Sequence, residues 1–214
     1  MPPSKSAARA AASKVAKFDI RQSHPALYRA GRKIEEIRSP KGTFLAVDGV
    51  GEPGGDAFQQ AVHRLFSLAY TTKFAIKKAG GADFSIPALE CLWPEEICGK
   101  PMTEWRWRVM LRVAPCVKAR GLNQVRRTLV EKKGLVTDDV KLITWTEGRA
   151  LQVLHLGPYE GVAASYQKLV AEAAARGLMC AGPPHELYLN DPRRVPPERI
   201  KTIVRLPVKP SPAS

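Results

Sequence analysis

Apolar and polar positions along the chain predict a strand-helix-strand-strand unit in its first half. A β-prone run at residues 43–49 ends in the Gly- and Pro-rich turn 51–55, and Asp56 can cap the helix that follows. The helix is expected to end near Gly80, and extended segments at 83–93 and 105–113 complete the unit. The apolar positions that recur on one face of the helix are Phe58, Val62, Leu65, Phe66 and Ala69.

The same order of elements returns in the second half. Residues 151–155 are predicted to form a strand, 157–159 its exit turn, and a helix then runs to Gly177, with extended segments at 185–189 and 202–208. The apolar face of this helix comprises Val162, Tyr166, Leu169, Val170 and Ala173. A basic amphipathic stretch predicts a connecting helix over 117–134. We therefore expect an α+β fold made of a pseudo-two-fold pair of modules, 43–113 and 140–209, with antiparallel sheets and a ligand groove between them.

This repeat suggests where a site would lie. Two half-sheets that each carry a helix can bury both helices on one side and leave a concave surface between the halves on the other. Clefts between modules are favoured ligand sites. An acid occurs at a similar position in each unit, Glu90 and Glu186. Pseudo-symmetry would bring both acids toward the shared cleft.

The surroundings of the two acids favour chemistry or cation binding. Glu186 and Tyr188 are two apart in a predicted strand, so their side chains share a face. Glu90 stands between apolar Leu89 and Leu92, which would raise the pKa of an inward-pointing carboxyl. An acid among aromatic rings can bind a lipophilic cation or hold a water as a general base. The alternative is an edge acid paired with an arginine.

Aromatic residues spread over both halves would suit a planar organic ligand. Tyr159 follows Gly157 and Pro158 on a turn and is not easily explained as core. Core packing is the alternative for Trp105 and Trp107, because their strand alternates between an apolar face and a face with Arg106, Arg108 and Arg112. The full aromatic set is Trp93, Trp105, Trp107, Tyr159 and Tyr188.

Composition narrows the class of protein. The chain has 214 residues, of which 44% are hydrophobic and 25% charged, so it can build a core and is not wholly disordered. No apolar run approaches the length of a membrane span. The four cysteines and four histidines lack disulfide-scaffold or metal-ligand spacing, and phosphate-loop and Gly-x-Ser-x-Gly motifs are absent. We expect a cytoplasmic protein without metal or cofactor, in which His155 is a hydrogen-bonded structural residue.

Half of the formal charge of +14 lies in residues 1–42, which hold ten Lys or Arg and three acids. This segment is interpreted as a basic, partly disordered extension, with residues 210–214 as a tail; its start also has the composition of an organelle transit peptide. Nucleic-acid binding, through this extension and the Arg106, Arg108 and Arg112 face, is the competing hypothesis. It ranks second because the acids and aromatics lie in the body, away from the concentrated positive charge.

Several segments also carry a family resemblance. The chain resembles the GyrI-like small-molecule-binding proteins over about residues 34–209, in the stand-alone branch described as cyclopropanoid cyclopropyl hydrolases. It differs at Cys91, where the family usually has glycine, and at Pro94, where a second tryptophan is common. The segments are Phe44-Leu45-Ala46-Val47-Asp48-Gly49, Gly51-Glu52-Pro53-Gly54-Gly55, Leu89-Glu90-Cys91-Leu92-Trp93, Trp105-Arg106-Trp107, His155-Leu156-Gly157-Pro158-Tyr159, and His185-Glu186-Leu187-Tyr188-Leu189-Asn190-Asp191-Pro192-Arg193-Arg194.

The resemblance implies a function. Ligands of the family are flat, lipophilic and often cationic, and some members add water to open the strained cyclopropane of DNA-alkylating natural products. It implies a cofactor-independent hydrolase that detoxifies such compounds, with Glu90 and Glu186 as its acids. The alternative is a non-catalytic drug-binding or sequestering protein. The residues implied as pocket walls or hydrogen-bond donors are Tyr159, Tyr188, Trp93 and Trp107. No helix-turn-helix module precedes the first strand, which favours sequestration or catalysis over transcriptional sensing.

Overall fold

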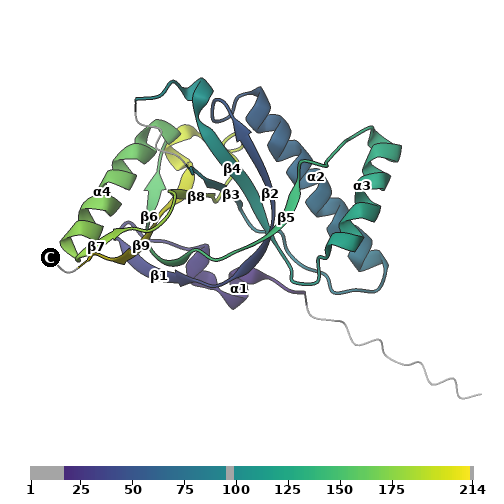
Figure 1. The fold of residues 1–214 in the computed structure, drawn as a ribbon, viewed down its shortest axis with the longest axis horizontal. Coiled ribbons are helices and arrows are strands. Elements are labelled where there is room, and N and C mark those ends of the chain that lie inside the picture. The colour runs from purple at the N-terminus through teal and green to yellow at the C-terminus, as the bar shows by residue number, and fades with distance from the viewer. Residues whose placement is uncertain (1–16, 95–98, 213–214) are drawn as a thin grey trace, which may run out of the picture.

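One antiparallel sheet runs through the whole fold, with helices packed on it (Figure 1). The computed structural model describes residues 17–94 and 99–212. The helices are α1 (Ile20–Ser23), α2 (Asp56–Lys78), α3 (Ala119–Lys133) and α4 (Val162–Ala175). The strands are β1 (Glu35–Ser39), β2 (Gly42–Val50), β3 (Leu89–Leu92), β4 (Arg106–Val113), β5 (Lys141–Trp145), β6 (Gly148–Leu156), β7 (Leu178–Cys180), β8 (His185–Tyr188) and β9 (Lys201–Pro210).

The strand order confirms the predicted pair of modules. It runs β1-β6-β9-β8-β3-β4-β2-β5, with β7 added beside β9. The order is symmetric when β2, β3 and β4 of the first module are exchanged with β6, β8 and β9 of the second. The two modules meet where β3 pairs with β8.

Each module also receives a strand from the segment that precedes the other module. β1 comes before β2, the first core strand of the first module, but pairs with β6 of the second, and β5 comes before β6, the first core strand of the second module, but pairs with β2 of the first. Residues 141–145 therefore belong structurally to the first half of the sheet, although they lie within the predicted second module. This exchange ties the halves together, so we expect them to unfold as one unit.

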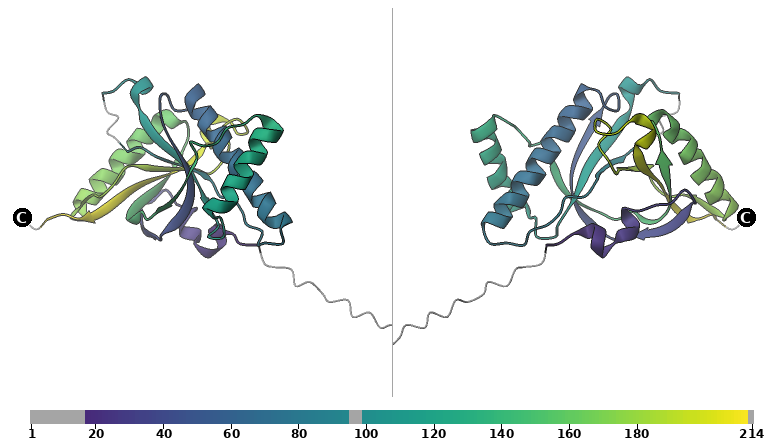
Figure 2. Two further views of the ribbon diagram at one scale, coloured as in Figure 1. Left: turned by 45° about the vertical axis from the view of Figure 1, so that its right-hand side comes forward. Right: turned by 180° about the vertical axis from the view of Figure 1, so that it is seen from behind.

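The helices of the two modules, α2 and α4, cover the same face of the sheet. α2 packs on β2 and β4, and α4 packs on β6 and β9. α2 begins at Asp56 after Gly55, without a side-chain cap, so Asp56 is the first helical residue rather than the predicted cap. In α4 the apolar face is narrower than predicted, since Val170 is 38% exposed while Leu169 and Ala173 are buried. α3, the predicted connecting helix, packs on α2 (Figure 2).

The opposite face of the sheet is covered by the N-terminal segment. Ile20, Leu27 and Tyr28 pack there against Leu187 of β8 and Ile203 of β9. The expectation that this face would remain an open concave surface is therefore wrong. Residues 17–42 were assigned to a basic extension, but their apolar anchors and β1 hold them on the domain. The rest of that predicted extension, residues 1–16, lies outside the described residues.

The arginines of β4 have their own contacts. Arg108 binds the Asp48 carboxylate with donor–acceptor distances of 2.6 and 3.1 Å. The Arg112 guanidinium lies over the Phe44 ring, 4.8 Å from its centroid. The predicted alternation of β4 is confirmed, but these two side chains do not form an open phosphate-binding row. Among the helices that the structure describes, none is long and apolar enough to cross a bilayer.

Candidate functional site

Glu186 is the centre of a hydrogen-bonded aromatic cluster. Trp93 Nε1 donates to Glu186 Oε1 at 2.8 Å, and the Tyr188 hydroxyl donates to Glu186 Oε2 at 3.0 Å. Each carboxylate oxygen therefore accepts a hydrogen bond from a different aromatic side chain. Two further rings extend the cluster: Trp105 meets Trp93 edge-on at 5.9 Å between centroids, and Tyr159 meets Tyr188 edge-on at 5.6 Å. We call these five residues the Glu186 site.

Strand pairing between the modules creates this arrangement. Cys91 of β3 lies opposite Glu186 of β8, and Leu89 lies opposite Tyr188. The pairing continues past β3, where the Trp93 backbone N–H donates to the Pro184 carbonyl at 3.0 Å. Directly opposed residues share a face of the sheet, so Trp93, Glu186 and Tyr188 point to the helix side. Because α2 and α4 pack on the outer strands, this central part of the face lies between the two helices.

Burial dominates the electrostatics of the site. Burial raises the pKa of Glu186 above its usual range, although hydrogen bonds from Tyr188 and Trp93 and the charge of His185 oppose the shift. Burial and the nearby Glu186 carboxylate raise the pKa of Tyr188 and of Tyr159. The site thus combines a carboxylate of increased basicity with two phenols that remain protonated. A base and proton donors are present side by side.

The site is accessible from solvent. Glu186 and Tyr188 are only partly buried, and Tyr159 is 39% exposed. Cys91, which is paired with Glu186 across the strands, is fully buried, and burial raises the pKa of its thiol well above the usual value. A protonated, buried thiol is a poor nucleophile, so Cys91 serves packing rather than chemistry. Two cavities of about 780 and 430 Å³ are lined by other residues. The Glu186 site is therefore assigned from the chemistry and contacts of its side chains.

His155 fixes the turn that carries Tyr159. Its Nε2 lies 2.9 Å from the Pro158 carbonyl oxygen and its Nδ1 lies 3.0 Å from Ser165 Oγ. A carbonyl only accepts, so Nε2 carries the hydrogen and Nδ1 accepts from the serine. The ring fills the space beside Gly161, where an added Cβ would lie 2.9 Å from His155 Cε1. The prediction that His155 is a hydrogen-bonded structural residue is confirmed.

Glu90 does not belong to this site. It pairs with Leu187, one position out of step with the Cys91–Glu186 pair, and adjacent residues of a strand point to opposite faces. The prediction that both acids face one cleft is therefore wrong. Glu90 is 3% exposed and accepts a hydrogen bond from the Tyr28 hydroxyl at 3.0 Å.

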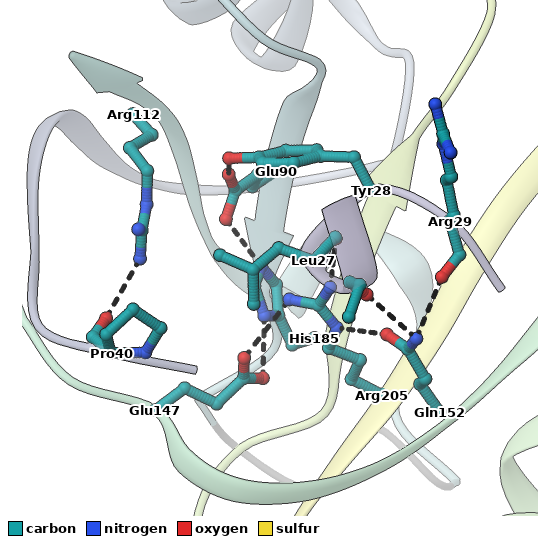
Figure 3. A network of polar contacts seen from close by, with 11 residues as sticks. Leu27, Tyr28, Arg29, Pro40, Glu90, Arg112, Glu147, Gln152, His185 and Arg205 are labelled. Atoms are coloured by element: carbon teal, nitrogen blue, oxygen red, sulfur yellow. Dashed lines mark hydrogen bonds and ion pairs between the residues drawn. The ribbon is translucent and has the colours of Figure 1, made fainter. Parts of the chain in front are cut away.

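Glu90 is part of a buried charge network on the face covered by the N-terminal segment (Figure 3). His185 Nε2 lies 3.1 Å from Glu90 Oε2, and His185 Nδ1 lies 2.8 Å from Glu147 Oε1. Arg205 Nη1 contacts Glu147 Oε2 at 3.2 Å, and Arg205 Nε donates to Gln152 Oε1 at 2.9 Å. The network also fastens the N-terminal segment, since Arg205 donates to the Leu27 carbonyl and Gln152 donates to the Ala26 and Arg29 carbonyls.

The charges of this network balance when His185 is protonated. Burial alone would lower the pKa of His185, but Glu147 and Glu90 outweigh it and raise the pKa above its usual value. Burial would raise the pKa of Glu147, but His185 and Arg205 lower it. Two carboxylates then face an imidazolium and a guanidinium. Glu147 and Arg205 could not be identified from local periodicity; their only signal in the sequence is that two charged residues lie in or beside apolar strands.

Trp107 lies in the core of the first module and not at the predicted ligand wall. It is 2% exposed, its ring lies against Gly49 and packs edge-on against Phe58, and its Nε1 donates to the Gly51 carbonyl at 3.2 Å. The clean alternation of β4 requires a buried face, which explains this placement. Trp105, by contrast, is partly exposed beside Trp93.

Comparisons with known proteins agree with the fold and with a small-molecule site. The profile of the GyrI-like small molecule binding domain matches residues 127–209. No curated protein matches the chain significantly. Among solved structures, an uncharacterised conserved protein from Listeria innocua is 35% identical with a TM-score of 0.84, covering 90% of this chain and 100% of that chain.

Two further structures extend the comparison. A hydrolase from Listeria innocua is 34% identical with a TM-score of 0.84, and the match covers 91% of this chain and 100% of that one. The C-terminal domain of EcmrR is 13% identical with a TM-score of 0.52, over 83% of this chain and 96% of that chain. The latter likeness is one of fold alone.

Proposed function

The chain belongs to the GyrI-like small-molecule-binding family, and from this premise we propose that it binds planar lipophilic or cationic organic compounds at the Glu186 site and hydrolyses cyclopropanoid genotoxins there. The observation that carries the proposal is the Glu186 carboxylate, held by two aromatic donors, partly exposed, and raised in pKa by burial. The 34% identical hydrolase from Listeria innocua supports catalysis over binding alone.

The walls of the site suit a flat ligand. Trp105 contacts Trp93 and Tyr159 contacts Tyr188, and both present partly exposed aromatic surface, which stacks on planar rings. A lipophilic cation would also be attracted to the negative charge of Glu186. These features explain binding of a compound class rather than of one compound.

Ring opening of a cyclopropane fused to a dienone needs a base and a proton donor. The water oxygen bonds to the ring methylene carbon as the strained C–C bond breaks, and the electron pair moves onto the ketone oxygen to give a phenolate. Glu186 takes the proton of the attacking water. The phenolate takes a proton from the donor, and solvent returns one proton from Glu186 to that donor, so the net reaction is addition of one water.

The contacts favour Tyr159 as the donor. The Tyr188 hydroxyl is already committed to Glu186 Oε2, and Glu90 points to the other face of the sheet. Tyr159 is more exposed, and its raised pKa keeps the phenol protonated at neutral pH. We assign Glu186 as the base, Tyr159 as the donor, and Tyr188 and Trp93 as residues that position the base. Acting in the cytoplasm, the enzyme would destroy an alkylator before it reaches DNA.

Glu186→Gln tests this assignment because it keeps the shape of the side chain but removes the base. We expect hydrolysis of a spirocyclopropyl dienone, followed by chromatography, to fall by about two to four powers of ten while a planar dye still binds. Tyr159→Phe should lower the rate with little effect on stability. Glu160→Gln, an exposed acid next to Tyr159, is the control and should keep full activity.

Two outcomes would change the conclusion. Full activity of Glu186→Gln would exclude the mechanism. Wild-type protein that binds the alkylator but returns it unchanged would support the alternative function, sequestration of the toxic compound.

A further inference from the structure

A buried arginine that forms no ion pair with an acid of the described residues points to the sheet face opposite the chemistry proposed above. Arg112 is 6% exposed, and its guanidinium donates one hydrogen bond, from Nη2 to the Pro40 carbonyl at 3.1 Å (Figure 3). The guanidinium also lies over the face of the Phe44 ring. No carboxylate of the described residues forms an ion pair with it. An arginine keeps its positive charge in a protein, so this buried charge is not balanced by an ion pair, although it lies near enough to the Tyr28–Glu90 pair to lower the pKa of Tyr28.

Arg112 lines a cavity of about 430 Å³ between the N-terminal segment and the ends of three strands. Gly42 lies directly beside the guanidinium, since an added Cβ would lie 2.6 Å from Arg112 Cζ and the arginine would have to move. The absence of a side chain at residue 42 leaves room for the guanidinium at the cavity. The residues that line the cavity are Phe18, Ile20, His24, Pro40, Lys41, Gly42, Thr43, Ser85, Arg112, Val113, Pro115 and Thr144.

The side chains that line this cavity include hydrogen-bond donors and basic groups but no acid. Lys41 and His24 add basic groups at the rim, and Thr43, Ser85 and Thr144 add hydroxyl donors, but the lining contains no acid. Asp19, which contacts Ser85, is neutralised by Arg21: its two carboxylate oxygens accept from Arg21 Nε and Nη2 at 2.9 and 2.6 Å. The positive charge in the cavity is therefore not compensated from its edge.

We propose that this cavity binds a small oxyanion, a phosphate or a carboxylate, with the Arg112 guanidinium as its main ligand. The guanidinium presents parallel N–H groups that match two oxygens of such an anion, and Lys41 and the hydroxyls complete the contacts. Apolar Phe18, Ile20 and Val113 would accommodate a small organic body attached to the anion. Arg112 points to the sheet face opposite Glu186, and no residue of the Glu186 site lines this cavity, so its occupancy does not depend on the proposed hydrolysis.

Binding is tested by titrating the full chain with inorganic phosphate and with benzoate, against sodium chloride at matched ionic strength. Calorimetry and thermal unfolding should show saturable binding and an increase in Tm with at least one of the two oxyanions. Binding of benzoate but not of phosphate would identify an organic acid as the ligand. Binding of phosphate but not of benzoate would identify a phosphate ester or free phosphate. If phosphate and benzoate each change Tm only as much as sodium chloride does, the proposal is overturned.

Variants locate the site. Arg112→Lys keeps the charge but loses the planar fork, and Arg112→Met loses both, so affinity should fall by about 10- to 100-fold in each. Arg108→Gln, on the same strand but bound to Asp48, is the matched control and should bind as the wild type does.

Two further measurements test the site even if an Arg112 variant fails to fold. Lys41→Gln at the exposed rim should weaken binding, and the Arg112 Nε–H resonance of the wild type should shift on saturation. Unchanged affinity in Lys41→Gln together with an unmoved Arg112 resonance would overturn the proposal.

Discussion

Glu147→Gln should destabilise the protein through the buried charge network, with a pH dependence that identifies the cause. The Glu147 side chain is fully buried between His185, at 2.8 Å, and Arg205, at 3.2 Å. The substitution keeps its size but leaves Glu90 as the remaining carboxylate of the network, facing two cations. Removing one partner of a buried ion pair costs about 3–5 kcal/mol because the other charge stays buried. For a chain of this length we expect Tm to fall by about 6–20 °C.

The pH dependence follows from the two shifted pKa values. The pKa of His185 is raised from 6.5 in the folded state, so its pairing stabilises fully below 6.5 and is lost as the pH rises through the folded value. The pKa of Glu147 is lowered from 4.5, so its contribution is present above 4.5 and lost as the pH falls through the folded value. The penalty of Glu147→Gln should therefore be largest between these limits and decline at higher pH toward the part due to Arg205.

Urea denaturation of wild type and variant across this pH range measures the penalty directly. Glu36→Gln is the control, because Glu36 binds Arg149 at 2.8 and 2.9 Å on the surface, where solvent replaces the lost contacts. A penalty below about 1 kcal/mol, typical of an exposed pair, would refute the network as a source of stability. A penalty that does not change with pH would refute the protonated state of His185.

Three further predictions concern the two faces of the sheet. Trp93→Phe removes a hydrogen bond to the Glu186 carboxylate and should raise its pKa further, so the acidic limb of the hydrolysis pH profile moves to higher pH; an unmoved limb would exclude Glu186 as the titrating base. Tyr28→Phe leaves Glu90 without its phenol donor and should cost about 1–3 kcal/mol in urea denaturation, whereas exposed Tyr70→Phe should leave the midpoint unchanged; equal midpoints would contradict the buried contact. Titration with a rhodamine dye should quench tryptophan fluorescence through the exposed part of Trp105, and neither quenching nor a thermal shift across a panel of planar cations would contradict the proposed binding.

The local pattern of the chain was sufficient for the main elements and for one part of the site. Period-2 and period-3.6 apolar spacing located the long helix of each module and the strands beside it, because that spacing reflects which side of each element is buried, but it did not predict α1, β1, β5 or β7. It also placed Glu186 and Tyr188 on one face of one strand, where they share a hydrogen bond. Tyr159 was distinguished from core residues because it follows a Gly-Pro turn.

Contacts between segments far apart in the chain could not be obtained this way. Whether Glu90 and Glu186 share a face depends on the register of β3 against β8, and a shift of one residue moves a side chain to the other side of the sheet. The same long-range packing brings Glu147, Arg205 and Tyr28 together and places the N-terminal segment over them. Local periodicity reports which residues are buried, whereas the tertiary structure decides which buried residues meet. That is why one predicted acid belongs to the candidate site and the other to the buried network that holds the fold together.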